Sequence, residues 1–200
     1  MKKRILSFIL VLGLLALMLT GCTSDSKDSG SSTKTAKART LEEIKKDGKI
    51  RIGVFSDKNP FGYVDENGEY QGYDVYYARR LGEDLGVDVN FVSTEAANRI
   101  EYLQTGKVDV ILANFTVTPE RAEEVDFAAP YMNVALGVVS KDDNVITTLD
   151  NWNADDSIIV ISGTTAETYL IANYPDIPLQ KFDSYAVSYT HLRAHETRHD

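Results

Sequence analysis

The sequence is poor in the residues that form disulfides and in the side chain that most often carries acid–base chemistry. Of its 200 residues one is a cysteine, Cys22, and all three histidines fall within the last ten positions. A single thiol excludes an intramolecular disulfide. Residues 23–190 contain neither thiol nor imidazole, which excludes histidine-dependent catalysis and cysteine–histidine zinc sites within that stretch.

Positive charge is also scarce. The chain has 21 Lys and Arg against 30 Asp and Glu, a formal net charge of −9. Such a balance argues against nucleic acid and anionic membrane surfaces as general partners. Three of the cations, at positions 2–4, precede an apolar run at 5–19. This is the layout of a secretory signal, and the run is too short for a comfortable membrane span, so we expect an exported protein.

The end of the apolar run predicts how the protein is held after export. The letters LTGC, ending at Cys22, resemble a lipobox, in which the cysteine is acylated and becomes the first residue of the mature protein. We predict a lipoprotein signal peptide at 1–22, with lipidation of Cys22 and anchoring on the outer face of the cytoplasmic membrane. A flexible tether follows at 23–40, because this stretch is dominated by Ser, Lys, Asp, Gly and Thr.

The last residues, 186–200, are expected to be non-native. Val187–Thr197 resembles an in-frame translation of a transposase-type sequencing adaptor, so we place the end of native sequence near Tyr185. His191 and His195 have the spacing of a helical metal pair, but we assign no metal and no cofactor to them. Removing the three cations of the signal, and the two cations and two acids of this tail, leaves 16 Lys and Arg against 28 Asp and Glu, a net charge of −12.

Between these ends the chain alternates helical and strand patterns. In the first part we expect helices at 41–47, 74–85 and 95–105 and strands at 49–54, 88–93 and 108–112. This alternation indicates a mainly parallel α/β sheet. Four apolar residues of the second helix recur at helical spacing and should face the core: Val75, Ala78, Leu81 and Leu85.

Turn and strand signals extend this organisation. Asn67-Gly68 between two short β-prone runs predicts a hairpin. The apolar run at 134–140 predicts a long strand. A second α/β unit should follow, with strands at 157–162 and 179–182 around a helix at 165–173.

Arg121 is the first candidate for a ligand contact. Thr118 can cap a helix that begins at Pro119, which places Arg121 in the first turn. The helix dipole disfavours a cation there, and an anion bridging the guanidinium and the free N–H groups would reverse the sign. The alternative is that Arg121 pairs with Glu120 or Glu124 on a solvated face.

Two segments carry a resemblance to a known family. The letters GKVDVILANFTVTPERAEEVDFAAPYM and NPFGYVDENGEYQGYD resemble the amino-acid-binding proteins of ABC importers, the family 3 extracellular solute-binding proteins. The resemblance covers about 41–185 and looks closest to the aspartate/glutamate-binding branch. It implies an α/β, periplasmic-binding-protein-like two-lobe fold of type II, with lobe 1 at 41–136 and a truncated lobe 2 at 137–185.

The resemblance also implies a function and the residues that perform it. It implies a monomeric binding protein, not an enzyme, that closes on an amino acid and delivers it to an ABC permease. Arg121 and Thr116 would hold the α-carboxylate, the carbonyl of Asn114 would accept from the ammonium, and Thr165 would make the contact from lobe 2. For Thr116, Asn114 and Thr165, ordinary turn and cap chemistry is the alternative.

Two further cations favour an acidic ligand. Arg99 sits where relatives for other substrates have an apolar residue, and Lys58 where many have an aromatic one. With Arg121 they would give three cations around the cleft, which suits the two carboxylates of aspartate or glutamate. The alternative is that Arg99 bridges to Glu95 while Lys58 is solvated beside Asp57.

Two other functional classes stay open at this stage. A dehydratase-like enzyme could be built on the same fold, with its catalytic acids outside the sequence given. A surface adhesin or the sensor module of a receptor is the other alternative. Ligand binding without turnover would separate the binding protein from the enzyme.

Overall fold

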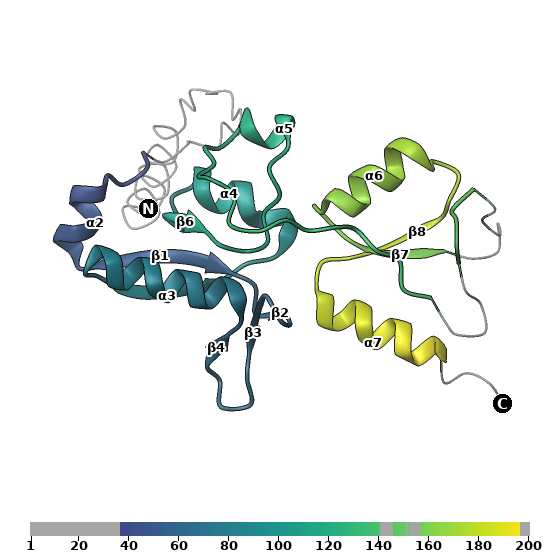
Figure 1. Cartoon of the computed structure of the whole chain (residues 1–200), viewed down its shortest axis with the longest axis horizontal. Helices are drawn as coiled ribbons and strands as arrows, with labels where there is room; N and C mark the ends of the chain where they lie inside the picture. The colour runs from purple at the N-terminus through teal and green to yellow at the C-terminus, as the bar shows by residue number, and fades with distance from the viewer. Residues whose placement is uncertain (1–36, 141–145, 151, 153–156, 197–200) are drawn as a thin grey trace, which may run out of the picture. The chain divides into compact units, whose positions relative to one another are not determined.

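The computed structural model describes residues 37–140, 146–150, 152 and 157–196 (Figure 1). The predictions for Cys22, for the signal peptide and for most of the tether therefore lie outside the described residues. Within the described part, no helix is both long and apolar enough to cross a membrane.

A parallel three-stranded sheet with strand order β5-β1-β6 forms the first unit. β1 (Lys49–Val54) lies between β5 (Asp88–Ser93) and β6 (Val110–Ile111), in the register Ile52 to Phe91 and Ile52 to Val110. The helix α3 (Tyr73–Leu85) runs along β1 (Figure 1) and buries Val75 and Ala78 completely. The predicted parallel sheet and the predicted core face of this helix are confirmed.

The first helix shows how local sequence sets the element bounds. α2 (Leu41–Asp47) begins at a capping box, in which the Thr40 hydroxyl accepts from the Glu43 N–H and the Glu43 carboxylate accepts from the Thr40 N–H. It ends at Gly48, whose φ of 72° is left-handed and therefore suits glycine.

A small antiparallel sheet lies between β1 and α3 in the sequence. It consists of β2 (Asp57–Lys58), β3 (Gly62–Val64) and β4 (Tyr70–Gln71). The predicted turn at Asn67-Gly68 is confirmed, with the Asp65 carboxylate accepting from the Asn67 N–H at 2.9 Å.

A second α/β unit follows in the sequence. β7 (Ile158–Ile161) pairs in parallel with β8 (Leu179–Phe182), and α6 (Thr165–Asn173) and α7 (Tyr185–Glu196) flank them (Figure 1). From here on, lobe 1 denotes the unit from α2 to α5 and lobe 2 the unit from β7 to α7, while the predicted bounds of 41–136 and 137–185 stay predictions. Most of α7 falls in the stretch expected to be non-native, and that boundary stays a prediction.

Three elements differ from the prediction. The expected helix at 95–105 is a 3₁₀ turn, η1 (Ala96–Asn98), followed by α4 (Arg99–Gln104), because the backbone of Asn98, with φ −90° and ψ −3°, departs from α-helical values at the junction. The expected strand at 108–112 is shorter, since among the described residues β6 pairs with β1 alone, at Val110 and Ile111. The remaining helix of lobe 1, α5 (Pro119–Ala122), is as predicted.

The third difference is the apolar run at 134–140, for which the strand prediction is wrong. Among the described residues this run pairs with no strand, and Val139 is 79 % exposed. β-propensity describes how well a side chain fits a paired surface. Without a neighbouring strand, the same residues form an extended connection.

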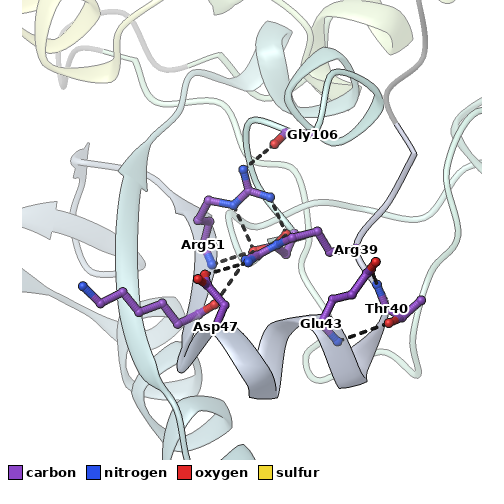
Figure 2. A network of polar contacts seen from close by, with 8 residues as sticks. Arg39, Thr40, Glu43, Asp47, Arg51 and Gly106 are labelled. Carbon is purple, nitrogen blue, oxygen red and sulfur yellow. Dashed lines mark hydrogen bonds and ion pairs between the residues drawn. The ribbon is translucent and has the colours of Figure 1, made fainter.

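A charge network fastens the chain before α2 to the amino end of the sheet. Figure 2 shows Arg39 and Arg51 converging, and both donate to the carboxylate of Asp109, whose side chain is 3 % exposed. The Arg39 Nε–Oδ1 distance is 2.9 Å and the Arg51 Nη2–Oδ1 distance is 2.7 Å. Burial opposes ionisation, but the hydrogen bonds from the two guanidinium groups hold the pKa of Asp109 well below its usual range.

Replacing this buried carboxylate should destabilise the fold. Asp109→Asn removes the charge that both arginines face, so we expect the free energy of unfolding to fall by about 3 kcal/mol at pH 7. Urea unfolding followed by circular dichroism would measure it. Arg80→Ala, which removes an exposed ion pair on α3, is the control and should cost about 0.5 kcal/mol or less.

The stability difference between wild type and Asp109→Asn should also depend on pH. A carboxylate whose folded pKa is depressed stabilises the protein above its unfolded pKa of about 3.9, and that stabilisation is lost as the pH falls towards the folded value. The stability difference between wild type and Asp109→Asn should therefore shrink by about 1 kcal/mol between pH 5 and pH 3. A difference that stays constant over this range would show that the charge of Asp109 is not what stabilises the fold.

Candidate functional site

The candidate site lies at the carboxyl ends of β1 and β6, the edge of a parallel sheet where ligands bind in open α/β folds. The loop after β1 supplies Lys58, the turn after β6 supplies Asn114 and Thr116, and the starts of α4 and α5 supply Arg99 and Arg121. Parallel pairing of the two strands brings these side chains to one edge.

Arg99 is buried, with 3 % of its surface exposed, and does not lie on a rim. Its Nε donates to the Ala96 carbonyl at 2.9 Å. Its Nη1 donates to the carbonyls of Ala113 and Asn114 at 3.1 and 3.2 Å. The bridge to Glu95 is not formed, because the Glu95 carboxylate accepts from Asn98 instead. Burial, followed by the nearby charge of Arg121, lowers the pKa of Arg99 to about 10.

Arg121 follows the predicted cap. The Thr118 hydroxyl accepts from its backbone N–H at 3.3 Å, and Pro119 is the first residue of α5. The guanidinium turns away from the solvated face, and Nη1 donates to the carbonyl of Thr116 at 2.7 Å. Thr116 thus contributes its backbone, and burial lowers the pKa of Arg121.

The two arginines converge on one uncharged acceptor. Arg99 Nη2 and Arg121 Nη2 both donate to the carbonyl oxygen of Gly163, at 2.9 and 3.0 Å. Both guanidinium groups also lie against the ring of Phe115, 4.4 and 4.8 Å from its centroid. Within the part of the chain that the structure describes, no carboxylate forms an ion pair with either. Two partly desolvated cations with spare N–H donors have the chemistry that binding an anion requires.

Lys58 lies in the site and is not solvated beside Asp57. Its Nζ donates to Asn114 Oδ1 at 2.7 Å and to the Tyr185 hydroxyl at 2.9 Å. The rings of Phe55, Phe61 and Tyr185 surround it at 5.3, 5.3 and 4.4 Å. Burial, followed by the charge of Arg99, lowers the pKa of Lys58 to about 8.

Sequence reasoning missed two residues behind Asn114. The buried carboxylate of Asp74 accepts from the Asn114 N–H at 2.9 Å and from the Tyr131 hydroxyl at 2.8 Å. Burial raises the pKa of Asp74. The sequence did contain an indication that Asp74 is buried. It lies one turn before Ala78, on the face of the predicted helix that carries the apolar residues.

The turn before α6 approaches lobe 1 through Gly163. A Cβ at this position would lie 2.5 Å from the Cα of Ala97, so only glycine allows the approach. Thr165 is the first residue of α6, and Thr164 is its cap. The Gly163 N–H is not available to an anion, because it already donates to Glu167 Oε2 at 2.7 Å.

A second contact joins the start of α7 to lobe 1. The Asp57 carboxylate accepts from the Ser184 hydroxyl at 2.7 Å and from the Tyr185 N–H at 2.8 Å. Tyr185 also packs edge-on against Phe55. No local sequence pattern indicates this contact, which joins segments more than a hundred residues apart.

The chain matches the model of the bacterial extracellular solute-binding proteins, family 3, over residues 50–195. It is 31 % identical to the glutamine-binding protein of Geobacillus stearothermophilus, a match that covers 96 % of this chain and 79 % of that protein.

Two solved structures are more similar in sequence. The L-cysteine solute receptor of Neisseria gonorrhoeae is 52 % identical with a TM-score of 0.76, over 79 % of this chain and 65 % of that one. The cysteine-binding protein of Campylobacter jejuni is 49 % identical with a TM-score of 0.73, over 78 % and 64 %. The chain thus spans slightly less than two thirds of these receptors.

These matches confirm the predicted type II periplasmic-binding-protein fold and the family resemblance. The α/β sheet, the cation-lined edge and the glycine turn that approaches it are therefore features of a solute-binding protein. The chain belongs to the bacterial extracellular solute-binding proteins of family 3.

Proposed function

We propose that the protein is the substrate-binding component of an ABC importer and that it captures an acidic amino acid, aspartate or glutamate, for delivery to a permease. The observation that carries the proposal is the convergence of Arg99 and Arg121 on the single carbonyl of Gly163. A carbonyl is a weaker acceptor for guanidinium than a carboxylate. A ligand carboxylate at this point would therefore replace a neutral contact with a charged one.

The charge balance of the site favours a dicarboxylic ligand. Lys58, Arg99 and Arg121 contribute three positive charges. The carboxylates of Asp57 and Asp74 act on Lys58 and that of Glu120 acts on Arg121, but within the described residues none of the three forms an ion pair with these cations. Asp57 and Asp74 are held by uncharged donors, so a ligand with two carboxylates would supply the directly paired negative charge that the cations lack.

The donors that remain suggest a role for each arginine. Two of the five N–H groups of Arg121 are used in the described contacts, which leaves enough for a forked interaction with an α-carboxylate. Four of the five on Arg99 are used, so it would contribute charge and one hydrogen bond. Asn114 and Thr165 are the proposed contacts to the ammonium and from lobe 2.

Hinge closure is the proposed mechanism. The contacts to the Gly163 carbonyl come from lobe 1, while Gly163 belongs to lobe 2. A ligand placed between them would contact both lobes and stabilise the closed form, which would then dock on the permease. A ligand shifts such an equilibrium only by its preference for one state.

A neutral amino acid such as cysteine is a second candidate. It is favoured by the 52 % and 49 % identity to the cysteine receptors of Neisseria gonorrhoeae and Campylobacter jejuni. The near-saturation of Arg99 by backbone carbonyls also allows a purely structural role for that residue. In that case Arg121 would hold the only ligand carboxylate.

Membrane attachment is proposed through Cys22. Acylation of this residue would anchor the tether on the outer face of the cytoplasmic membrane and keep the binding lobes close to the permease. The absence of any other cysteine leaves the folded part without a competing thiol.

Arg121→Ala should weaken amino-acid binding by about 100-fold, because it removes a forked, charge-assisted contact. Isothermal titration calorimetry with aspartate, glutamate, glutamine and cysteine would identify the ligand and measure the loss. Arg80→Ala on the exposed face of α3 is the control and should bind like wild type. Arg99→Leu is a less clean test, since it leaves three carbonyls without their donor. Unchanged affinity in Arg121→Ala would refute the proposed site.

Lys58→Met separates acidic from neutral ligands. If Lys58 faces a side-chain carboxylate, the variant should lose about 10-fold or more in affinity for aspartate and glutamate. Affinity for glutamine and cysteine should change much less. Lys45→Met, on the exposed surface of α2, is the matched control. Equal losses for acidic and neutral ligands would argue against acidic specificity.

Gly163→Ala should prevent the close approach of the two lobes, because its Cβ would overlap the backbone of Ala97. We expect weaker ligand binding and no ligand-induced decrease in the radius of gyration by small-angle X-ray scattering. Gly48→Ala is a matched control, since φ there is 72° against 75° at Gly163 and a Cβ would meet no atom within 4 Å. If both variants bind alike, the approach at Gly163 has no part in binding.

A further inference from the structure

We propose that Asp74 is a positioning residue for the ligand site. Its buried carboxylate holds the left-handed turn at Asn114 and through that turn sets the places of Lys58 and Arg99. The proposal rests on the proposed function only in that these cations are the ones expected to hold the ligand. Asp74 itself would make no ligand contact.

The burial of Asp74 calls for an explanation. Its side chain is at the second residue of α3 and is fully buried, at 0 % exposure. A buried carboxylate without a salt bridge is unfavourable unless strong hydrogen bonds stabilise it. Here two uncharged donors do so, the N–H of Asn114 on Oδ2 and the hydroxyl of Tyr131 on Oδ1.

The conformation of Asn114 depends on that contact. Its φ of 47° is the only positive value of a non-glycine residue in the described part of the chain. This region is unfavourable for residues with a Cβ, although Asn tolerates it better than most. The hydrogen bond from the Asn114 N–H to Asp74 offsets that strain at the exit of β6.

Asn114 in turn provides an acceptor to each of two site cations. Its side-chain Oδ1 accepts from Lys58 Nζ at 2.7 Å, and its backbone carbonyl accepts from Arg99 Nη1 at 3.2 Å. Both acceptors would point elsewhere if the residue relaxed to a right-handed or extended conformation. The carboxylate of Asp74 therefore acts on the site indirectly, since it holds Asn114, and Asn114 holds Lys58 and Arg99.

The other oxygen of Asp74 fixes the chain that leaves lobe 1. Tyr131 immediately precedes the residues that lead into the extended run at 134–140. Its ring packs with Tyr73 and Tyr77, at 6.1 and 5.1 Å between centroids. One carboxylate thus joins the start of α3 to the site turn and to the segment between the lobes.

The charges around Lys58 give a readout that does not require the ligand. Arg99 lowers the pKa of Lys58, while Asp74 and Asp57 raise it, and burial lowers it most. The Tyr185 hydroxyl faces the same ammonium and accepts its hydrogen bond. Removing the charge of Asp74 should shift the pKa of Lys58 downward, because one of its two stabilising carboxylates is gone.

The experiment is an NMR titration of the full chain labelled with ¹³C at the lysine ε-carbon, in wild type and Asp74→Asn. We expect the titration midpoint of Lys58 to be lower in Asp74→Asn than in wild type and the Asn114 amide proton to move upfield as its hydrogen bond weakens. Asp109→Asn is the control for a merely structural effect, because it should lower stability without moving either signal. An unchanged midpoint and an unchanged Asn114 amide in Asp74→Asn would overturn the proposal.

Calorimetry would then test whether the positioning role of Asp74 affects the affinity for an amino acid. Asp74→Asn should lower the affinity for whichever of aspartate, glutamate, glutamine or cysteine the wild type binds, by about 10-fold. If wild type binds none of these four, the proposed function fails, while the NMR result still decides the role of Asp74. Full affinity in Asp74→Asn would overturn the positioning role.

A rescue variant covers the case in which Asp74→Asn does not fold. Glycine adopts a positive φ without strain, so Asn114→Gly in the Asp74→Asn background should restore the folded state. The double variant should still show a lowered midpoint for Lys58, because the side-chain acceptor of Asn114 is absent. Failure of the glycine to restore folding would contradict the role assigned to the Asn114 turn.

Discussion

A guanidinium group taken out of water must keep its N–H groups bonded, and the site is built around that requirement at Arg99. Its donors reach carbonyls from three different segments, the 3₁₀ turn at Ala96, the end of β6 at Ala113 and Asn114, and the lobe 2 turn at Gly163. Because guanidinium stays charged at any physiological pH, the 3₁₀ turn and the end of β6 cannot separate without leaving the charge unpaired, whereas the contact to Gly163 can be exchanged for another acceptor. One buried side chain thereby fixes the lobe 1 side of the candidate site.

The two ends of the parallel sheet use charge in opposite ways. At the amino end Asp109 is saturated by Arg39 and Arg51, and the result is a closed network that fastens the chain before α2. At the carboxyl end the cations are held by neutral oxygens and keep donors to spare. The stabilising charge network and the candidate ligand site therefore lie at different ends of β1, so that contacts at one end can change without breaking the network at the other.

Much of the fold could be predicted because its signals are local. The cap at Thr118-Pro119 and the alternation of the strands with α3 and α6 depend on a few neighbouring residues, and they were predicted within a few positions. The sequence also predicts Lys58, Arg99 and Arg121 as candidate cations, and the structure brings them to one edge of the sheet, but their hydrogen-bond partners could not be predicted. Asp74 and Tyr131 act across 57 residues of sequence, and the run at 134–140 lacks the neighbouring strand that its composition would suit. Such features depend on tertiary pairing, which a single sequence does not specify.

The glycine at position 163 has a consequence for how the family can diversify. Because a Cβ at this position would lie only 2.5 Å from the Cα of Ala97, glycine gives the smallest possible separation between the two surfaces. Any side chain there would set a larger minimum gap, independently of which groups line the site. Ligand size and ligand charge would then be adjustable by separate positions, the first by the bulk at residue 163 and the second by the cations of lobe 1.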